Sequence, residues 1–289
     1  MNLQLFVSGI SMGFVYGMIA MGMVLIFRSV GVMNFAQGEF LMFGGYLCYT
    51  FNQLVGLNIV VSMILACLAM AIVGIIFQRF VYWPLRTAQV RAIIVSMMGA
   101  SIAFKEGAKL IWGSMPKNAD KLMEGTIQTA SGAFIQKQYL AIILVAVILM
   151  VLVYILLEKT FIGNIMQATA QDQYTASLMG IPVVLSISLT FAISAVITGI
   201  CGGLLAPIFF INTTMGATAG SKAFAAIVIG GFGSIPGAII GGLIVGLIES
   251  FGGVYISSTY QLVIIYVVLI LFLMFRPQGI FGGKIQEKA

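Results

Sequence analysis

Long apolar runs separated by short polar breaks constrain the fold of this chain more than any other feature. Residues 41–57, for example, contain no charged side chain, and across all 289 residues 61% are hydrophobic and only 8% are charged. Soluble domains carry roughly 25% charged residues. Because about 20 apolar residues form one membrane-spanning helix, the sequence predicts an all-α, polytopic membrane protein. No water-soluble block separates the runs, so we expect a single transmembrane domain over residues 1–289.

The runs predict about eight or nine membrane helices, one of which is short and broken. The clear segments lie at roughly 3–28, 38–56, 58–78, 91–112, 138–158, 183–211 and 258–276. Before the last of these, an apolar stretch from Ala223 is too short to span, a turn rich in glycine follows at 231–237, and a helix resumes at 238–248. The N-terminus has no basic region and no cleavage site, so we interpret the first run as a retained span.

Basic residues in the breaks predict the orientation, because cytoplasmic loops carry an excess of Lys and Arg. If the C-terminal tail is cytoplasmic, the breaks at 79–91, 159–182 and 232–237 are cytoplasmic too. The N-terminus and the break at 113–137 then lie outside. The net charge of +6 comes from basic residues that are scattered over loops and helix ends. We therefore expect these residues to lie at the surfaces of a lipid bilayer and not to bind nucleic acid.

The most informative break is the segment 34–40, NFAQGEF, between two apolar runs. Its carboxylate, Glu39, lies at or inside the predicted membrane edge, where ionisable groups are costly and usually functional. One interpretation is a short surface loop. The other is a broken helix that lines a solute path, since irregular backbone at membrane depth requires contact with protein or water.

A second break, 213–222, follows the run 183–211 much as the first break follows the first run. The two units point in opposite directions across the membrane, which is the pattern of an inverted repeat; chance resemblance is the alternative. Paired interruptions in such repeats mark transport sites. We therefore expect the translocation path to include Asn34, Phe35, Gln37, Glu39, Thr214, Lys222 and Phe224. For Lys222, snorkelling from a helix end is the other interpretation.

The break at 158–182 has the pattern of two short helices. The first is expected at 163–170, and Asp172 can cap a second one, because its carboxylate can accept bonds from exposed backbone N–H groups. Gly180 and Pro182 are typical of a helix end. Such a segment can fit a groove of a cytoplasmic partner, or it can be a structured connector. The residues expected to couple to a partner are Gly163, Ala170, Asp172, Ala176 and Gly180.

Several other chemistries are not supported. The chain has no histidine, and its three cysteines, Cys48, Cys67 and Cys201, lie in apolar runs without metal-ligand spacing. The glycines at 216–222 do not have the spacing of a phosphate-binding loop. We therefore expect no metal, no cofactor, no catalytic residue and no ATP site in this chain. Glycines spaced by four, as in Gly9, Gly13 and Gly17, predict close helix contact either within the chain or with another subunit.

Four ordered segments resemble LivH-type permeases, which are membrane subunits of branched-chain amino acid ABC importers. They are the first break with its preceding residues (VMNFAQGE, 32–39), the segment 170–181, the segment 222–238 (KAFAA followed by GGFGSIPGA) and the ending RPQGIFG (276–282). The resemblance covers nearly the whole chain. One departure is Gln37, where many members have histidine; if that position touches solute or a gate, the family's substrate preference does not carry over to this chain.

The resemblance implies an inverted-repeat helical fold similar to that of vitamin-B12-type ABC importers. It also implies a bacterial inner-membrane location and four partner chains: a second, paralogous permease, two cytoplasmic ATPase subunits and an extracytoplasmic binding protein. The expected function is ATP-driven import of leucine, isoleucine and valine by alternating access. The alternatives are a urea or short-amide permease, an ion-coupled carrier or channel, and a membrane enzyme, for which no nucleophile–base pair is visible.

Overall fold

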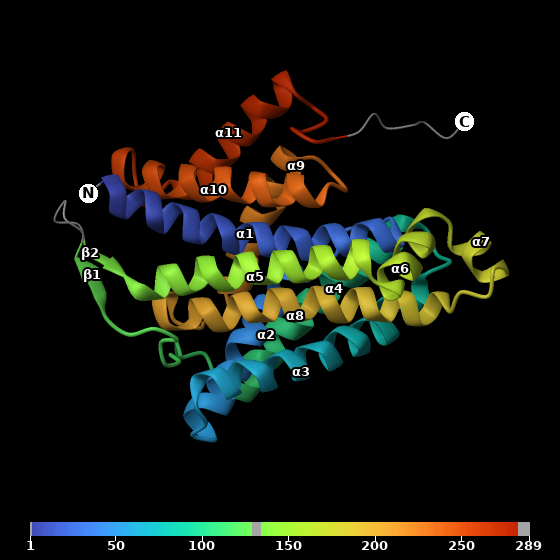
Figure 1. Ribbon diagram of the computed structural model, residues 1–289, viewed down its shortest axis with the longest axis horizontal. Coiled ribbons are helices and arrows are strands. Elements are labelled where there is room, and N and C mark those ends of the chain that lie inside the picture. Colours follow the sequence, from blue (N-terminus) through green and yellow to red (C-terminus); the bar gives the residue numbers. More distant parts are fainter. Residues whose placement is uncertain (1, 129–133, 283–289) are drawn as a thin grey trace. The chain divides into compact units, whose positions relative to one another are not determined.

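Apolar helices dominate the computed structural model, which describes residues 2–128 and 134–282 (Figure 1). Within those residues, five helices are long and apolar enough to cross a membrane: α1 (Asn2–Val30), α3 (Ile59–Phe77), α5 (Lys137–Lys159), α8 (Val183–Phe209) and α10 (Ile235–Tyr255). Two further apolar helices are shorter, α9 (Met215–Gly230) and α11 (Gln261–Phe275). The all-α polytopic prediction is therefore confirmed, whereas the count of eight or nine membrane helices stays a prediction.

The remaining elements connect or extend these helices. They are α2 (Gln37–Tyr49) with a π-helical turn (Thr50–Leu54), a π-helical turn (Gln78–Tyr82) and a 3-10 turn (Trp83–Leu85) after α3, α4 (Val90–Trp112), the antiparallel strands β1 (Thr126–Gln128) and β2 (Phe134–Gln136), α6 (Phe161–Gln171) and α7 (Gln173–Leu178). Most predicted ranges agree with these bounds to within a few residues. The prediction for α9 was wrong, because this helix begins at Met215 and not at Ala223.

The chain forms two compact units. Unit 1 comprises the described residues of Met1–Val24, Met123–Ala146 and Ser221–Ala289, and unit 2 comprises Leu25–Leu122 and Val147–Gly220. Each unit is made of segments that are distant in sequence, so both depend on long-range packing. The single transmembrane domain over the whole chain stays a prediction.

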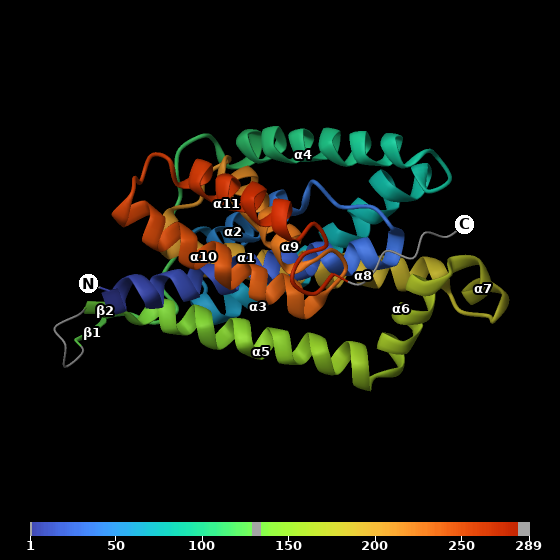
Figure 2. The same ribbon diagram turned by 90° about the horizontal axis from the view of Figure 1, so that it is seen from above.

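In unit 2, α2 packs along α8 and α3 because glycines allow the backbones to approach closely. A Cβ atom on Gly44 would collide with the backbone of Gly199, and a Cβ atom on Gly202 would collide with the carbonyl of Leu41. Beside this contact, the ring of Phe77 lies 5.2 Å from that of Phe40 and 6.1 Å from that of Phe191, centroid to centroid. α6 and α7 lie beside the N-terminal part of α8 (Figure 2).

In unit 1, α1 and α10 meet through their glycines. A Cβ atom on Gly13 would lie 2.7 Å from the Cα of Leu243, and one on Gly242 would lie 2.5 Å from the Cα of Gly17. The repeated glycine spacing on α1 therefore serves packing within this chain, which was one of the two interpretations of that pattern.

The turn between α9 and α10 is a second glycine-dependent feature of unit 1. Gly231 adopts a φ of 107°, and the Ser234 hydroxyl caps α10 by accepting a bond from the Gly237 N–H at 3.1 Å. The C-terminal segment folds back onto this turn, because the N–H groups of Ile280 and Phe281 donate to carbonyls at the end of α9. The RPQGIFG ending thus satisfies carbonyl groups that the helix end leaves free.

Candidate functional site

Most of the break between α1 and α2 is buried, although Gly31 and Phe35 are exposed. α1 ends at Val30, Gly31 adopts a positive φ of 71°, and α2 begins at Gln37. Asn34 is 1% exposed, and its side-chain oxygen accepts a bond from the Ala36 N–H at 3.0 Å. Its amide also donates to the Gln37 side-chain oxygen at 3.3 Å. The irregular backbone is therefore supported by protein contacts, which are one of the two settings, together with a water-filled cavity, that irregular backbone requires within a membrane.

Hydrogen bonds from the Gln37 side chain connect the start of α2 to the middle of α8. Its side-chain amide donates to the Thr198 hydroxyl at 2.6 Å and to the Ser194 hydroxyl at 2.8 Å. Gln37, Ser194 and Thr198 are all fully buried. Sequence reasoning singled out Gln37 but missed its partners. The available signal was their spacing of four residues, which puts both hydroxyls on one face of a helix.

Glu39 is a buried carboxylate with one oxygen bonded and one without a partner. It is 3% exposed, its Oε1 accepts a bond from the Ser101 hydroxyl of α4 at 3.2 Å, and its Oε2 has no hydrogen-bond donor within the described residues. A Cβ atom on Gly216 would lie 2.7 Å from that Oε2. The carboxylate therefore lies beside the first turn of α9, where the positive end of the helix dipole stabilises negative charge.

Phe35 and Thr214 lie in the same unit but are exposed. Phe35 is 43% exposed. The Thr214 N–H and hydroxyl both donate to the Asn212 side-chain oxygen, at 3.0 and 2.8 Å. This Asx turn starts α9 eight residues before the predicted start, because an Asn side chain satisfies the N–H groups that a helix start leaves free.

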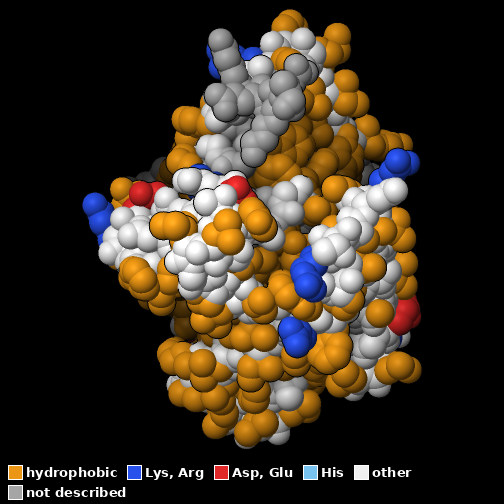
Figure 3. Space-filling model, turned by 90° about the vertical axis from the view of Figure 1, so that its right-hand side faces the viewer, with side chains coloured by type: hydrophobic (Ala, Val, Ile, Leu, Met, Phe, Trp, Pro, Cys, Tyr) orange, Lys and Arg blue, Asp and Glu red, His pale blue; other side chains and the backbone are white. Residues whose placement is uncertain are grey.

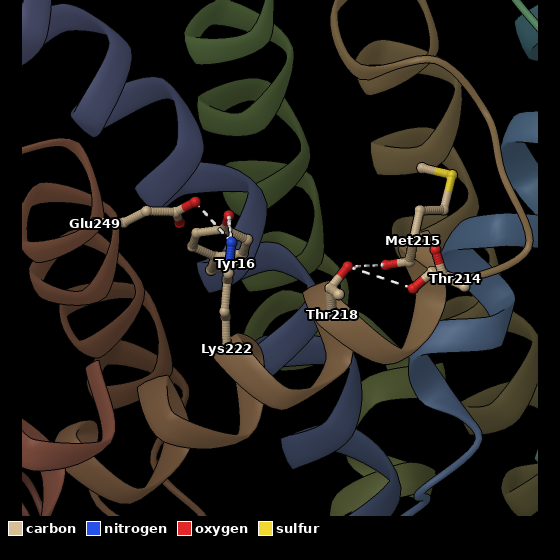
Figure 4. Close-up of polar contacts among 6 residues, drawn as sticks. All are labelled: Tyr16, Thr214, Met215, Thr218, Lys222 and Glu249. Atoms are coloured by element: carbon tan, nitrogen blue, oxygen red, sulfur yellow. Dashed lines mark hydrogen bonds and ion pairs between the residues drawn. The ribbon is translucent and has the colours of Figure 1, made fainter. Parts of the chain in front are cut away.

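Lys222 and Phe224 lie in unit 1. The Lys222 ammonium is 2.6 Å from Glu249 Oε1 and 3.2 Å from the Tyr16 hydroxyl, and it also faces the Tyr16 ring (Figure 4). The Lys222 and Glu249 side chains are only 13% and 14% exposed. Lys222 thus forms a buried ion pair, which replaces the snorkelling interpretation. The Phe224 ring packs edge-on against Phe232 with centroids 6.5 Å apart.

The segment between α5 and α8 forms the two short helices that the sequence predicts. Asp172 caps α7: its Oδ1 accepts bonds from the N–H groups of Tyr174 and Thr175, at 2.9 and 3.2 Å. Gly180 has a φ of 79° after α7. Gly163, in the first turn of α6, packs so closely on the end of α5 that a Cβ atom would collide with the carbonyls of Leu156 and Leu157.

The exposed surface of α6 and α7 carries large apolar side chains beside polar ones such as Thr175 and Ser177. Exposed side chains there include Phe161, Tyr174, Leu178 and Met179, each at least 70% exposed. Figure 3 views the end of unit 2 where these helices lie and shows hydrophobic side chains beside scattered Lys and Arg. Ala176, in contrast, is 5% exposed, and Ala170 is half-buried. Sequence reasoning missed the large apolar residues, because no local pattern shows which side of a six-residue helix faces outward.

Comparisons with known proteins agree with the motifs over the whole chain. A family model described as the permease component of branched-chain amino acid transport systems matches residues 5–273. The high-affinity branched-chain amino acid transport system permease protein BraD of Pseudomonas aeruginosa is 34% identical, over 99% of this chain and 97% of its own. Its counterpart LivH of Escherichia coli is 33% identical over the same shares. A probable LivH permease of Methanocaldococcus jannaschii is 29% identical, over 92% and 88%.

One solved structure is similar in fold. PsaBC from Streptococcus pneumoniae, in complex with Fab, superposes with a TM-score of 0.51 at 15% identity, covering 96% of this chain and 92% of that chain. At that identity the likeness concerns the arrangement of helices and not the solute.

Proposed function

Because the chain belongs to the family of permease components of branched-chain amino acid transport systems, we propose that it is the membrane-spanning subunit of an ATP-driven importer of leucine, isoleucine and valine. The observation that carries this proposal is the match along essentially the full length of relatives named for that transport. The chain performs no covalent chemistry in this role. ATP hydrolysis takes place in separate subunits.

The proposed complex contains a second, paralogous permease, two cytoplasmic ATPase subunits and an extracytoplasmic binding protein. In it the whole chain acts as one transmembrane permease domain, with the N-terminus outside and the C-terminus in the cytoplasm of a bacterial cell. The α6–α7 segment contacts an ATPase. Support for this contact comes from the large apolar side chains that α7 exposes, Tyr174 and Leu178, since exposed apolar groups on a loop outside the membrane are typical of a protein interface.

Within unit 2, the translocation path is proposed to pass Asn34, Phe35, Gln37, Glu39 and Thr214. Glu39 carries most of this assignment, because a buried carboxylate oxygen without a donor is costly unless another group pairs with it at some stage of the cycle. The ammonium group of an amino acid is such a partner. In unit 1, Lys222 and Phe224 are proposed to belong to the same path.

Proteoliposome transport tests the proposal. The permease is reconstituted with its paralogue and the ATPases, ATP is enclosed, and uptake of labelled leucine is measured with the binding protein outside. We expect uptake that needs ATP and that isoleucine and valine suppress. Suppression by urea or acetamide but not by valine would assign the complex to short amides. Uptake by the permease without any ATPase would show a self-sufficient carrier.

A matched pair of variants tests the ATPase contact. Leu178→Asp on α7 should release the ATPase and abolish uptake while the permease stays folded, because Leu178 is 70% exposed. Met115→Asp is the control, since Met115 is 77% exposed in the segment after α4. Equal ATPase recovery with both variants would remove α7 from the interface.

A further inference from the structure

The exposed side of α3 is aliphatic and leads to two arginines. α3 and the turns that follow it form a candidate membrane span, Ile59–Leu85, of 27 residues. One side of α3 packs on α8 and α2. On the other side, every third or fourth residue is an exposed aliphatic side chain: Ile64, Leu68, Ile72 and Ile75. Residues with this spacing lie in one line along a helix, and we call this line the α3 stripe.

Three residues continue the α3 stripe beyond its last isoleucine. Arg79 is exposed and lies in the π-helical turn Gln78–Tyr82, four residues after Ile75 and four before Trp83. The Arg86 guanidinium carbon lies 3.8 Å from the centroid of the Trp83 ring, and its Nη1 donates to the Trp83 carbonyl at 3.2 Å. The stripe therefore ends in two cations beside an indole ring.

Neither arginine is neutralised within the chain. In the part of the chain that the structure describes, both ion pairs join other residues, and no acidic residue occurs between positions 39 and 106 of the sequence. Arg79 is also the only charged residue of the span Ile59–Leu85. A guanidinium on the exposed side of a membrane span is costly unless its long side chain reaches the headgroup level. A lipid phosphate at that level supplies the missing anion.

The end of α5 provides a contrast. Both α3 and α5 end on the right-hand side of Figure 1. The exposed aliphatic residues of α5, such as Ile148 and Leu152, lead to Glu158 and Lys159, one acid and one base that are both exposed. Clusters of Lys and Arg next to a membrane span attract anionic lipids, and the adjacent acid weakens that attraction at the end of α5. Of these two ends, only that of α3 has an excess of positive charge.

We propose that the end of α3 binds an anionic phospholipid, with the phosphate at Arg79 and Arg86 and an acyl chain along Ile72 and Ile75. A guanidinium can bind a phosphate through two parallel N–H bonds. Trp83 fits the same depth, because tryptophan side chains prefer the headgroup level of a bilayer. An anionic headgroup is favoured over a zwitterionic one, because no carboxylate offsets the two cations. This binding does not depend on the transport function proposed above.

Fluorescence quenching by labelled lipids tests the site with the complete chain in phosphatidylcholine nanodiscs. The three native cysteines are replaced, and Ile72→Cys or Leu152→Cys carries a bimane fluorophore. These positions lie seven residues before Arg79 and Lys159, so both probes are at a similar distance from the charged ends. A small fraction of phosphatidylglycerol or phosphatidylcholine, with a nitroxide on the upper acyl chain, is then added. We expect phosphatidylglycerol to quench the probe at residue 72 severalfold more strongly than phosphatidylcholine, and both lipids to quench the probe at residue 152 equally.

Arginine variants test the phosphate contact. Arg79→Gln combined with Arg86→Gln should remove the preference for phosphatidylglycerol at residue 72. Arg28→Gln combined with Arg91→Gln is the matched control, because it removes the same charge from exposed arginines outside the α3 stripe, and it should preserve the preference. A preference that survives the first double variant would overturn the proposal. Equal quenching of the probe at residue 72 by the two lipids, with all arginines in place, would overturn it without any arginine variant.

The same measurement in the complex with the partner permease distinguishes a lipid from a protein on the α3 stripe. We expect the probe at residue 72 to remain accessible to phosphatidylglycerol in that complex. If both labelled lipids lose contact with residue 72 there but keep it with residue 152, the second subunit covers the stripe and the lipid proposal is overturned.

Discussion

Individual charged residues in this chain are buried in two different ways. Lys222 and Glu249 form an ion pair at 2.6 Å, whereas Glu39 has only a hydroxyl partner and the start of α9 beside it. Each of the two carboxylates, Glu249 and Glu39, has one oxygen without a hydrogen-bond partner within the described residues. A paired charge is mainly structural, and an incompletely paired one remains able to bind another group. The two residues that the sequence treated as equivalents in an inverted repeat thus have different surroundings.

Removing one member of the ion pair should cost more than removing both. Lys222→Met leaves Glu249 without its ion-pair partner and with the Tyr16 hydroxyl beside it, and we expect a loss of up to about 3–5 kcal/mol in the free energy of unfolding. Lys222→Met combined with Glu249→Gln should recover much of it. Thermal unfolding of the purified variants in detergent provides the measurement. If the double variant is less stable than either single one, the pair is not the main interaction of these side chains.

Gly38 should not tolerate even a methyl group. A Cβ atom there would collide with the carbonyl of Gly216, so Gly38→Ala should separate α2 from α9 and cost roughly 1–3 kcal/mol. Gly107→Ala is the control, because Gly107 lies in α4 with no atom near its Cβ position. The melting temperatures of both variants should be compared; equal values would contradict the close α2–α9 contact.

At the scale of elements, helix ends and turns carry most of the specific polar contacts. Asp172 caps α7, Ser234 caps α10, and the C-terminal segment covers the end of α9. Each of these contacts satisfies backbone N–H or C=O groups that a helix end would otherwise leave without hydrogen-bond partners. A single substitution at one of these ends is therefore expected to destabilise that helix more than the rest of the fold.

The α7 cap should be needed for assembly more than for insertion. Asp172→Ala removes the acceptor of two N–H groups and should destabilise α7 by about 1 kcal/mol. Asp172→Asn retains an acceptor oxygen and is the matched control. We expect less ATPase to co-purify with the alanine variant while membrane levels of both variants stay normal. Normal co-purification of Asp172→Ala would show that ordered α7 is not required.

Substitutions at two glycines of the α9–α10 turn can distinguish the effect of backbone strain from the effect of steric crowding. Gly231 and Gly233 both have positive φ, but only a Cβ atom at Gly231 would crowd the C-terminal segment, 2.5 Å from the Gly282 N. Gly231→Ala should therefore reduce folded yield and uptake more than Gly233→Ala. Gly253 is an unsuitable control, because it lies within α10 and a Cβ atom there would collide with the Gln261 side chain. Equal losses at the two turn positions would mean that strain alone matters.

For the whole molecule, the proposed orientation determines which surfaces meet which partners. It places the exposed apolar side chains of α7 in the cytoplasm and the segment after α4 outside. The proposal rests on the basic residues of the breaks, and the helices alone fit either direction.

Labelling in intact cells tests that orientation. Met115→Cys should react with a membrane-impermeant maleimide in intact cells, and Tyr174→Cys should react only after permeabilisation. Both side chains are more than 70% exposed, so access to the reagent and not burial limits the reaction. The opposite pattern would invert the topology and move the ATPase contact away from α7.

The sequence by itself determined the membrane class, the positions of most breaks, the Asp172 cap and the need for glycine on α1; the break predicted at 213–222 is an exception, because α9 already begins at Met215. These features depend on composition or on residues within one or two helical turns. Only the tertiary structure decided that Gln37 bonds to Ser194 and Thr198, that Lys222 pairs with Glu249, and that the glycines of α1 meet α10. Lipid and protein interior are similarly apolar, so a helix surface rich in Leu, Ile and Val does not reveal which face meets a neighbouring helix. That choice depends on how helices distant in sequence fit together.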